Sequence, residues 1–259
     1  MVAKKLLLFK AFLKKEFILF RRYLVNSIGG MLTIYVIFLL LLGSYRGLVG
    51  GGDHGDTVEQ LVVGYVLWFF MLSTYQDVAY TLRREAKEGT LEQLYMSVHG
   101  FGWVMGAKAA AGFFVNSILV VILLRAVMVV TGSTLNIDLL SIVPITIFTL
   151  IGILGIGFTV GGLTLVFKRI ESFTQMIQFA LVALVAVDPQ SVWWVRLLPG
   201  SYGASLVRRV MIGGAHLSNL GFWECAFFIV ISLGHLGLGY GIYRLCERKA
   251  MSEGLLGHY

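Results

Sequence analysis

The chain has 259 residues, of which 58% are hydrophobic and only 14% are charged, with a formal net charge of +7. A soluble domain carries about 25% charged residues, so the composition excludes a soluble globular protein and predicts a single integral membrane domain. The basic residues cluster in short segments between apolar stretches, which is typical of loops beside a membrane and not of a nucleic-acid-binding groove.

Residues 4–24 are predicted to form an amphipathic helix. Seven Lys and Arg residues fall in this stretch, too many for a helix that crosses a bilayer. The opposite side of the helix is rich in leucine and phenylalanine. This pattern favours a helix that lies in the membrane interface with its aromatic face toward the lipid.

Six apolar segments follow and predict six transmembrane helices. Their predicted ranges are 26–45, 58–80, 106–131, 140–167, 173–187 and 222–245. The fifth has only 15 residues, about 22 Å as a helix, which is shorter than the roughly 30 Å hydrocarbon core. Three of the Gly-x-x-x-Gly pairs, in or beside the third, fourth and sixth apolar segments, permit close helix packing. They are Gly102/Gly106, Gly157/Gly161 and Gly237/Gly241.

The distribution of Lys and Arg predicts the orientation in the membrane. With the N-terminus in the cytoplasm, 16 of the 21 basic residues lie on the inner side. The prediction is therefore that both termini are cytoplasmic. The polar run at 83–100, between the second and third apolar segments, then faces the cytoplasm.

Residues 188–221 are predicted to be extracytoplasmic and are partly apolar. Pro189 and Pro199 interrupt this segment, Trp193 and Trp194 stand next to each other, and the piece 201–213 is too short to cross. The pattern fits a re-entrant hairpin in the outer leaflet and equally an interfacial loop anchored by tryptophan.

Ionisable residues within apolar segments are functional candidates. His235 is either such a candidate or a neutral histidine bonded to a neighbouring helix. Arg125 is expected to extend to the outer interface, where Glu224 is a possible partner. Asp77 is expected at the interface and not in the interior.

Several kinds of chemistry have no motif in the sequence. There is no Gly-Lys dipeptide and hence no phosphate-binding loop. Neither His-Glu-x-x-His nor Gly-x-Ser-x-Gly occurs, and the five histidines are scattered. We therefore expect no catalytic residue, no metal site and no cofactor bound by this chain.

The polar run itself has an amphipathic pattern. Leu91, Leu94, Tyr95 and Val98 form an apolar stripe at helical spacing, and the glutamates point elsewhere. This favours a short helix over 83–100 with one acidic, exposed face. The alternative is a solvated linker at the end of the second span.

Two segments resemble motifs of the ABC-2 type permeases, the membrane subunits of type V ABC exporters. The first is the run from Arg84 to Leu94, REAKEGTLEQL, after the second span. The second is Pro199-Gly200-Ser201-Tyr202, followed by Arg208, before the last span. This second match departs from the family pattern, with Leu198 where asparagine is usual and Ser201 where threonine is usual.

The resemblance implies a fold, partners and roles. It implies an all-α membrane domain in the plasma membrane of a prokaryote, which pairs with a second, identical or homologous, permease. Two separate ATPase subunits, which bind ATP and Mg, would dock on the polar run as a coupling helix, and no nucleic acid is involved. The coupling residues are Arg83, Arg84, Glu85, Glu88, Gly89, Thr90, Leu91, Glu92 and Leu94. The outer gate comprises Pro199, Tyr202 and Arg208.

The expected cargo is hydrophobic or amphiphilic, such as a drug, a lipid or an antibiotic. Aromatic and amide side chains on otherwise apolar helices suit such a molecule. The candidate path residues on the second and fifth spans are Tyr65, Trp68, Phe69, Gln175, Gln178 and Phe179; each is equally compatible with packing or lipid contact. Polysaccharide export is the alternative within the family. A non-transporting scaffold and a membrane-embedded enzyme are alternatives outside it.

Overall fold

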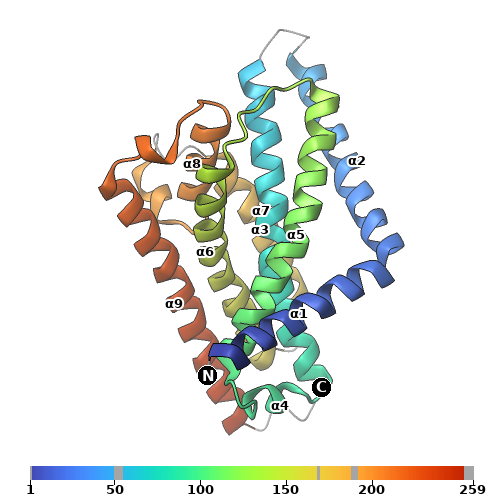
Figure 1. Cartoon of the computed structure of the whole chain (residues 1–259), viewed down its shortest axis with the longest axis vertical. Coiled ribbons are helices and arrows are strands. Elements are labelled where there is room, and N and C mark those ends of the chain that lie inside the picture. Colours follow the sequence, from blue (N-terminus) through green and yellow to red (C-terminus); the bar gives the residue numbers. More distant parts are fainter. Residues whose placement is uncertain (1, 50–54, 168–169, 188–191, 254–259) are drawn as a thin grey trace.

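The structure is a computed structural model that describes residues 2–49, 55–167, 170–187 and 192–253 (Figure 1). All regular elements in these ranges are helical. They are α1 (Val2–Arg22), α2 (Leu24–Val49), α3 (Gly55–Lys87), α4 (Leu91–Tyr95), α5 (Phe101–Thr131), α6 (Leu139–Val166), α7 (Glu171–Ala186), the 3-10 helix η1 (Trp193–Leu197), α8 (Ser201–Met211), the 3-10 helix η2 (Leu217–Asn219) and α9 (Phe222–Ser252). The segment predicted at 188–221 lies partly outside the described residues.

Five of the helices are long and apolar enough to cross a membrane. They are α2, α3, α5, α6 and α9. This confirms the prediction of an all-α membrane protein. Helix α7, with 16 residues, is shorter than these five.

The helices extend beyond the apolar segments that predicted them. The segment 58–80 lies within α3, which continues to Lys87, and the segment 222–245 lies within α9, which continues to Ser252. The added residues include Arg, Glu and Lys, which are good helix formers. Hydropathy marks only the apolar part of each helix, whereas the backbone hydrogen bonds continue into the polar flanks.

The core is centred on α3 and α6, and α5, α7 and α8 add buried side chains to it. In the apolar windows of both α3 and α6, 44% of the residues are buried, compared with 6% in α2. At Gly155 of α6, a Cβ would lie 2.2 Å from the carbonyl oxygen of His235 on α9. Glycine therefore permits a backbone contact that no side chain could fit.

One of the three Gly-x-x-x-Gly pairs makes close contacts at both of its positions. A Cβ on Gly157 would lie 3.0 Å from Tyr75 O, and a Cβ on Gly161 would lie 2.3 Å from Leu82 Cδ1, both on α3. Open space surrounds Gly106, Gly237 and Gly241. In a chain with 31 glycines such pairs arise by chance. The motif alone therefore does not show which pair packs closely against another helix.

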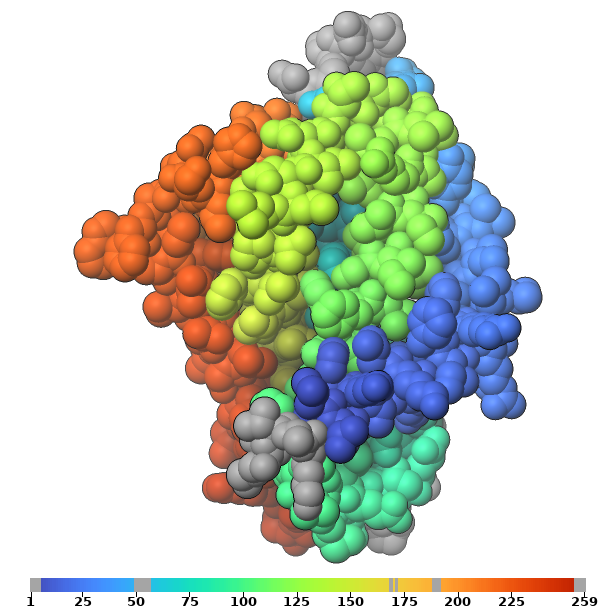
Figure 2. Space-filling model, in the orientation of Figure 1, coloured from blue at the N-terminus to red at the C-terminus, as the bar shows by residue number. Residues whose placement is uncertain are grey.

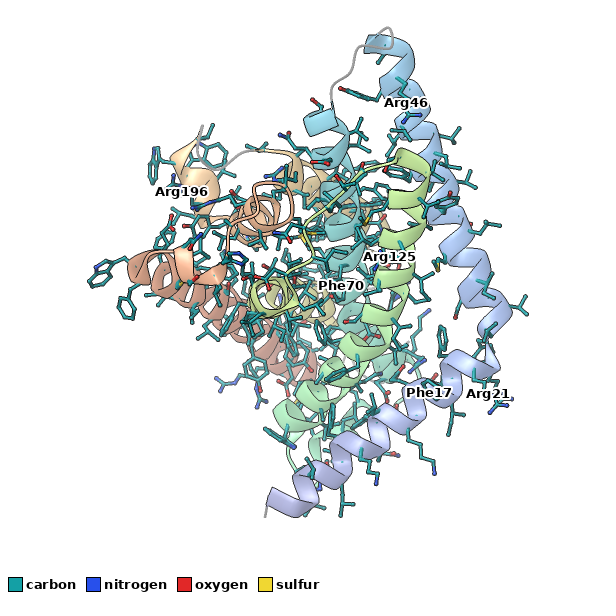
Figure 3. All side chains as sticks on the ribbon, turned by 45° about the horizontal axis from the view of Figure 1, so that its top comes forward. Phe17, Arg21, Arg46, Phe70, Arg125 and Arg196 are labelled. Atoms are coloured by element: carbon teal, nitrogen blue, oxygen red, sulfur yellow. The ribbon has the colours of Figure 1, made fainter. Side chains whose placement is uncertain are left out.

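The bundle has two distinct ends, which we call the α4 end and the α8 end. Helix α4 and the last turns of α9 lie at one end, and α8 lies toward the other (Figure 1). Helix α1 crosses the surface of the bundle obliquely near the α4 end (Figure 1 and Figure 2) and meets α2 at a bend (Figure 3). It packs against α5 through Phe9 and Phe114, whose ring centroids are 6.0 Å apart. It exposes other apolar side chains, including Phe17 and Ile18.

Helix α8 lies inside the bundle. Nine of its 11 residues are buried, and it packs against α6, α3 and α7. Trp193 and Trp194 in η1, by contrast, are 73% and 53% exposed. The segment thus contains both an exposed tryptophan pair and a buried helix that is too short to cross.

Candidate functional site

A cavity of about 670 Å³ lies between α2, α3, α7 and α8. Its wall is largely apolar and aromatic, with a few polar groups, as is common in sites for small amphiphilic molecules. The lining residues are Ile37, Leu41, Thr57, Gln60, Leu61, Gly64, Tyr65, Trp68, Gln178, Phe179, Val182, Val185, Ala186 and Arg208. We call this the lateral cavity.

The lateral cavity collects four of the six predicted path residues. Tyr65 and Trp68 come from α3, and Gln178 and Phe179 come from α7. Phe69 instead packs against the hydrophobic core, because it follows Trp68 and points about 100° away on the helix. Gln175 is exposed about one turn earlier on α7 and does not line the cavity.

Backbone carbonyls accept the hydrogen bonds of the aromatic wall. The Tyr65 hydroxyl donates to the carbonyl of Ile34 on α2 at 2.6 Å. Trp68 Nε1 donates to the carbonyl of Gln178 on α7 at 3.2 Å. These bonds tie α3 to both neighbouring walls of the cavity. They satisfy the polar atoms of the two rings, so the rings contribute mainly apolar surface.

Arg208 joins α8 to the C-terminal end of α7. Its Nη1 donates to Val185 O at 2.8 Å and its Nη2 donates to Val187 O at 3.3 Å. Unsatisfied carbonyls at a helix C-terminus attract cations, and a guanidinium can bond two at once. Arg208 therefore fixes one wall of the lateral cavity while lining it.

The other two predicted gate residues lie elsewhere. Tyr202 is buried against Phe227 and Phe228 of α9. It lines a separate cavity with Glu224. Six residues separate Tyr202 from Arg208, which places them on different faces of α8. Pro199 precedes the helix and lines neither cavity.

The polar run differs from the single helix expected over 83–100. Helix α3 ends at Lys87, and Gly89 has a φ of +68°, a left-handed conformation that commonly ends a helix. Thr90 then donates through its backbone N–H to Glu85 O at 3.0 Å and through Oγ1 to Glu85 Oε2 at 2.5 Å. A short helix α4 follows.

The turn and α4 present a mixed acidic and apolar surface. The side chains of Arg84, Glu88 and Glu92 are exposed, as is Gly89. Arg83, Glu85, Thr90 and Leu94 are partly buried, and Leu91 is buried. Val98 is fully exposed, so its predicted place in the apolar stripe is wrong, because α4 ends at Tyr95.

Aromatic contacts attach α4 to α9. The ring of Phe101 makes stacked contacts with both Tyr95 and Tyr243, with centroid distances of 4.5 and 5.2 Å, and the two tyrosine hydroxyls share a hydrogen bond. Burial raises the pKa of the Tyr95 phenol well above its usual range. Arg244 lies over the Tyr95 ring at 5.9 Å and pairs with Glu247 at 3.1 Å. The sequence pattern did not predict this contact, because Tyr95 and Tyr243 are 148 residues apart.

The isolated ionisable residues have partners or positions that the sequence did not predict. Glu224 pairs with Arg209 at 3.4 Å, so the predicted pairing with Arg125 is wrong. A Cβ at Gly112 on α5 would lie 2.5 Å from Asp77 Oδ2, which places this carboxylate between helices. The buried Nδ1 of His235 has no hydrogen-bond partner among the residues that the structure describes. Those residues also contain no group of three His, Cys, Asp or Glu side chains able to hold a metal.

The fold is that of a helical membrane protein, and the lateral cavity, of about 670 Å³, lies beside its short helix α7. A scan against protein-family models finds no match to the chain. A search of curated proteins finds no match either. A function for the chain is therefore argued from the motifs in its sequence and from the geometry of its sites.

Proposed function

We propose that this chain is the membrane subunit of an ATP-driven exporter of the ABC-2 permease type. It moves a hydrophobic or amphiphilic molecule, such as a drug, lipid or antibiotic, out of the cytoplasm or inner leaflet. ATP and Mg are bound by separate ATPase subunits. In this proposal the α4 end is cytoplasmic, α1 lies in the inner interface, α7 completes a set of six spans, and α8 is the re-entrant element.

The lateral cavity is the observation that carries the proposal. The candidate path residues lie on the predicted second and fifth spans, and α3 and α7, which correspond to these spans, form two of the cavity walls. Only four of the 14 lining residues are polar and not aromatic. They are Thr57, Gln60, Gln178 and Arg208. The rest of the wall is apolar or aromatic, which suits the apolar part of an amphiphile.

A second membrane subunit would cover the side on which the lateral cavity lies. Phe179 and Met176 of α7 are 76% and 67% exposed, and Leu40 of α2 is 66% exposed. These side chains form part of the apolar surface of α2 and α7. Two copies that face each other through this surface would join their lateral cavities into one central path.

The exposed turn between α3 and α4 supports an external motor. The exposed Met96 and Val98 offer apolar contact area, and the exposed Glu88 and Glu92 offer polar contacts of the kind found at the rim of an interface. The aromatic contact from Tyr95 to Tyr243 would transmit a displacement of this turn to α9. No phosphate-binding loop occurs in the sequence, so the energy source lies on another chain.

Affinity purification from native membranes tests this assignment. We expect a stoichiometric subunit with phosphate-binding loops to accompany the chain. Glu88→Lys should reduce its recovery or uncouple its ATPase activity, whereas Glu59→Lys on α3, near the α8 end, should not. Repeated isolation of the chain without a nucleotide-binding subunit in mild detergent would contradict the proposal.

A further inference from the structure

A second cavity, of about 460 Å³, lies between α1, α3 and α5 toward the α4 end. We call it the basic cavity because four cationic and two acidic side chains line it. They are Arg83, Arg84, Lys87, Lys108, Glu16 and Asp77. The lining therefore carries an excess of two positive charges. The resemblance assigns Arg83 and Arg84 to coupling, but neither it nor the proposed transport path assigns a role to the cavity itself.

Lys108 is the most informative of these residues. Its side chain comes from α5 and is only 7% exposed. Among the described residues it has no hydrogen bond and no ion pair within 4.0 Å. The carboxylates of Asp77 and Glu16 attract it only from beyond ion-pair distance. A buried ammonium without a directly bonded partner is unfavourable, so a ligand that bonds to it would bind with a gain in free energy.

Two further cations face the same space and are also unpaired. Arg84 and Lys87 are three residues apart on the last turns of α3, where both side chains are exposed. Neither makes an ion pair within 4.0 Å among the described residues. The two acids compete with a ligand for these cations only from beyond ion-pair distance: the Asp77 carboxylate, which attracts Lys108 and Arg84, lies against Gly112 on α5, and Glu16 comes from α1.

We propose that the basic cavity binds a phosphoryl anion through Lys108, Arg84 and Lys87. The ligand class is the phosphodiester of an anionic lipid headgroup, or free phosphate as the other source of the same group. Arginine and lysine are the usual partners of phosphate. The position favours a lipid, because α1 borders the cavity and exposes Phe17 and Ile18 beside it.

This inference is separate from the proposed transport function, because it concerns binding to the chain without nucleotide. The purified full-length chain in neutral detergent is titrated with short-chain phosphatidylglycerol, with phosphatidylcholine of equal chain length, and with inorganic phosphate. The shift of the thermal unfolding midpoint gives each apparent Kd. We expect phosphatidylglycerol to bind more tightly than phosphatidylcholine.

Three variants make the test specific. Lys108→Gln should weaken phosphatidylglycerol binding about tenfold, the equivalent of one lost charge-assisted hydrogen bond. Lys14→Gln is the matched control, because Lys14 is exposed on α1 and does not line the cavity. Glu16→Gln removes a repulsive charge and should tighten binding. This opposite sign keeps the test valid if Lys108→Gln does not fold.

Each outcome supports or contradicts the inference. Tighter binding of phosphatidylglycerol with the expected variant order supports a lipid headgroup. Equivalent behaviour with inorganic phosphate supports the same site and identifies free phosphate as the ligand. The inference would be overturned if neither phosphatidylglycerol nor inorganic phosphate binds. It would also be overturned if the wild type, Glu16→Gln and Lys108→Gln bind with equal affinity.

Discussion

Arg208 offers a quantitative test of how α8 holds the wall of the lateral cavity. Arg208→Met keeps an unbranched, largely aliphatic side chain but removes the donors to Val185 O and Val187 O. Each charge-assisted bond contributes about 1.5 kcal/mol at the lower end of its range. With a small contribution from the helix dipole, the end of α7 loses about 3 kcal/mol.

Hydrogen exchange in nanodiscs measures this loss directly. The amide of Val187 bonds to Ala183 O at 3.0 Å and reports opening of the last turn of α7. A loss of about 3 kcal/mol corresponds to exchange roughly 150-fold faster. The control is Arg209→Met, since the neighbouring Arg209 forms a half-exposed pair with Glu224. That pair contributes at most about 1 kcal/mol, roughly a fivefold change in exchange if it influenced this turn.

The reasoning is refuted if Arg208→Met leaves exchange at the end of α7 unchanged, or if both variants accelerate it equally. The first result would mean that the two hydrogen bonds do not hold the helix end. The second would mean that any loss of charge on α8 loosens the bundle. Arg208→Lys should give an intermediate rate, because a lysine keeps the charge and loses the two-pronged geometry.

Further predictions concern packing and pH. Gly155→Ala places a Cβ 2.2 Å from His235 O and should destabilise the protein by about 1–3 kcal/mol in thermal unfolding, whereas Gly237→Ala, in open space, should be neutral or slightly stabilising. Hydrogen bonds from Ser141 and His216 hold the pKa of Asp138 below its usual value of about 3.9. The ionised Asp138 therefore stabilises the folded protein fully above the ordinary pKa of about 3.9. This stabilisation is lost as the pH falls through the lower pKa that Asp138 has in the folded state. Asp138→Asn should reduce the acid-induced fall in the unfolding midpoint between pH 7 and pH 3; an unchanged acid profile would exclude this role.

The apolar helices could be predicted because a membrane protein must satisfy its backbone hydrogen bonds within each segment. Hydropathy therefore located five long helices and the short α7, although their polar ends extended further than expected. Thr90 and Gly89 show why the structure of the polar run was harder to predict. The amphipathic stripe suggested one helix, whereas the left-handed glycine ends α3 and begins a turn.

Which side chains meet in each site depends on how the helices pack against one another, and the spacing of residues along the sequence does not reveal this. Tyr65 and Trp68, which were proposed as path residues from their type and helix, line the lateral cavity. Phe69, adjacent in sequence, was included for the same reason and points elsewhere. In the sequence, Lys108 is only one of the 16 basic residues predicted on the inner side. Its burial could not be predicted, because it depends on how α1 and α5 pack over α3.

The most direct test of the central claim is ATP-driven movement of a fluorescent amphiphile in proteoliposomes that contain the chain with its co-purified ATPase subunit. The probe is a short-chain fluorescent phospholipid. We predict ATP-dependent movement in the wild type and its loss in Gly64→Trp, which fills the lateral cavity from α3. Gly29→Trp, on the exposed side of α2 with no atom within 4 Å of its Cβ position, should transport normally. Wild-type transport by a correctly folded Gly64→Trp protein would contradict the claim that cargo passes through the lateral cavity.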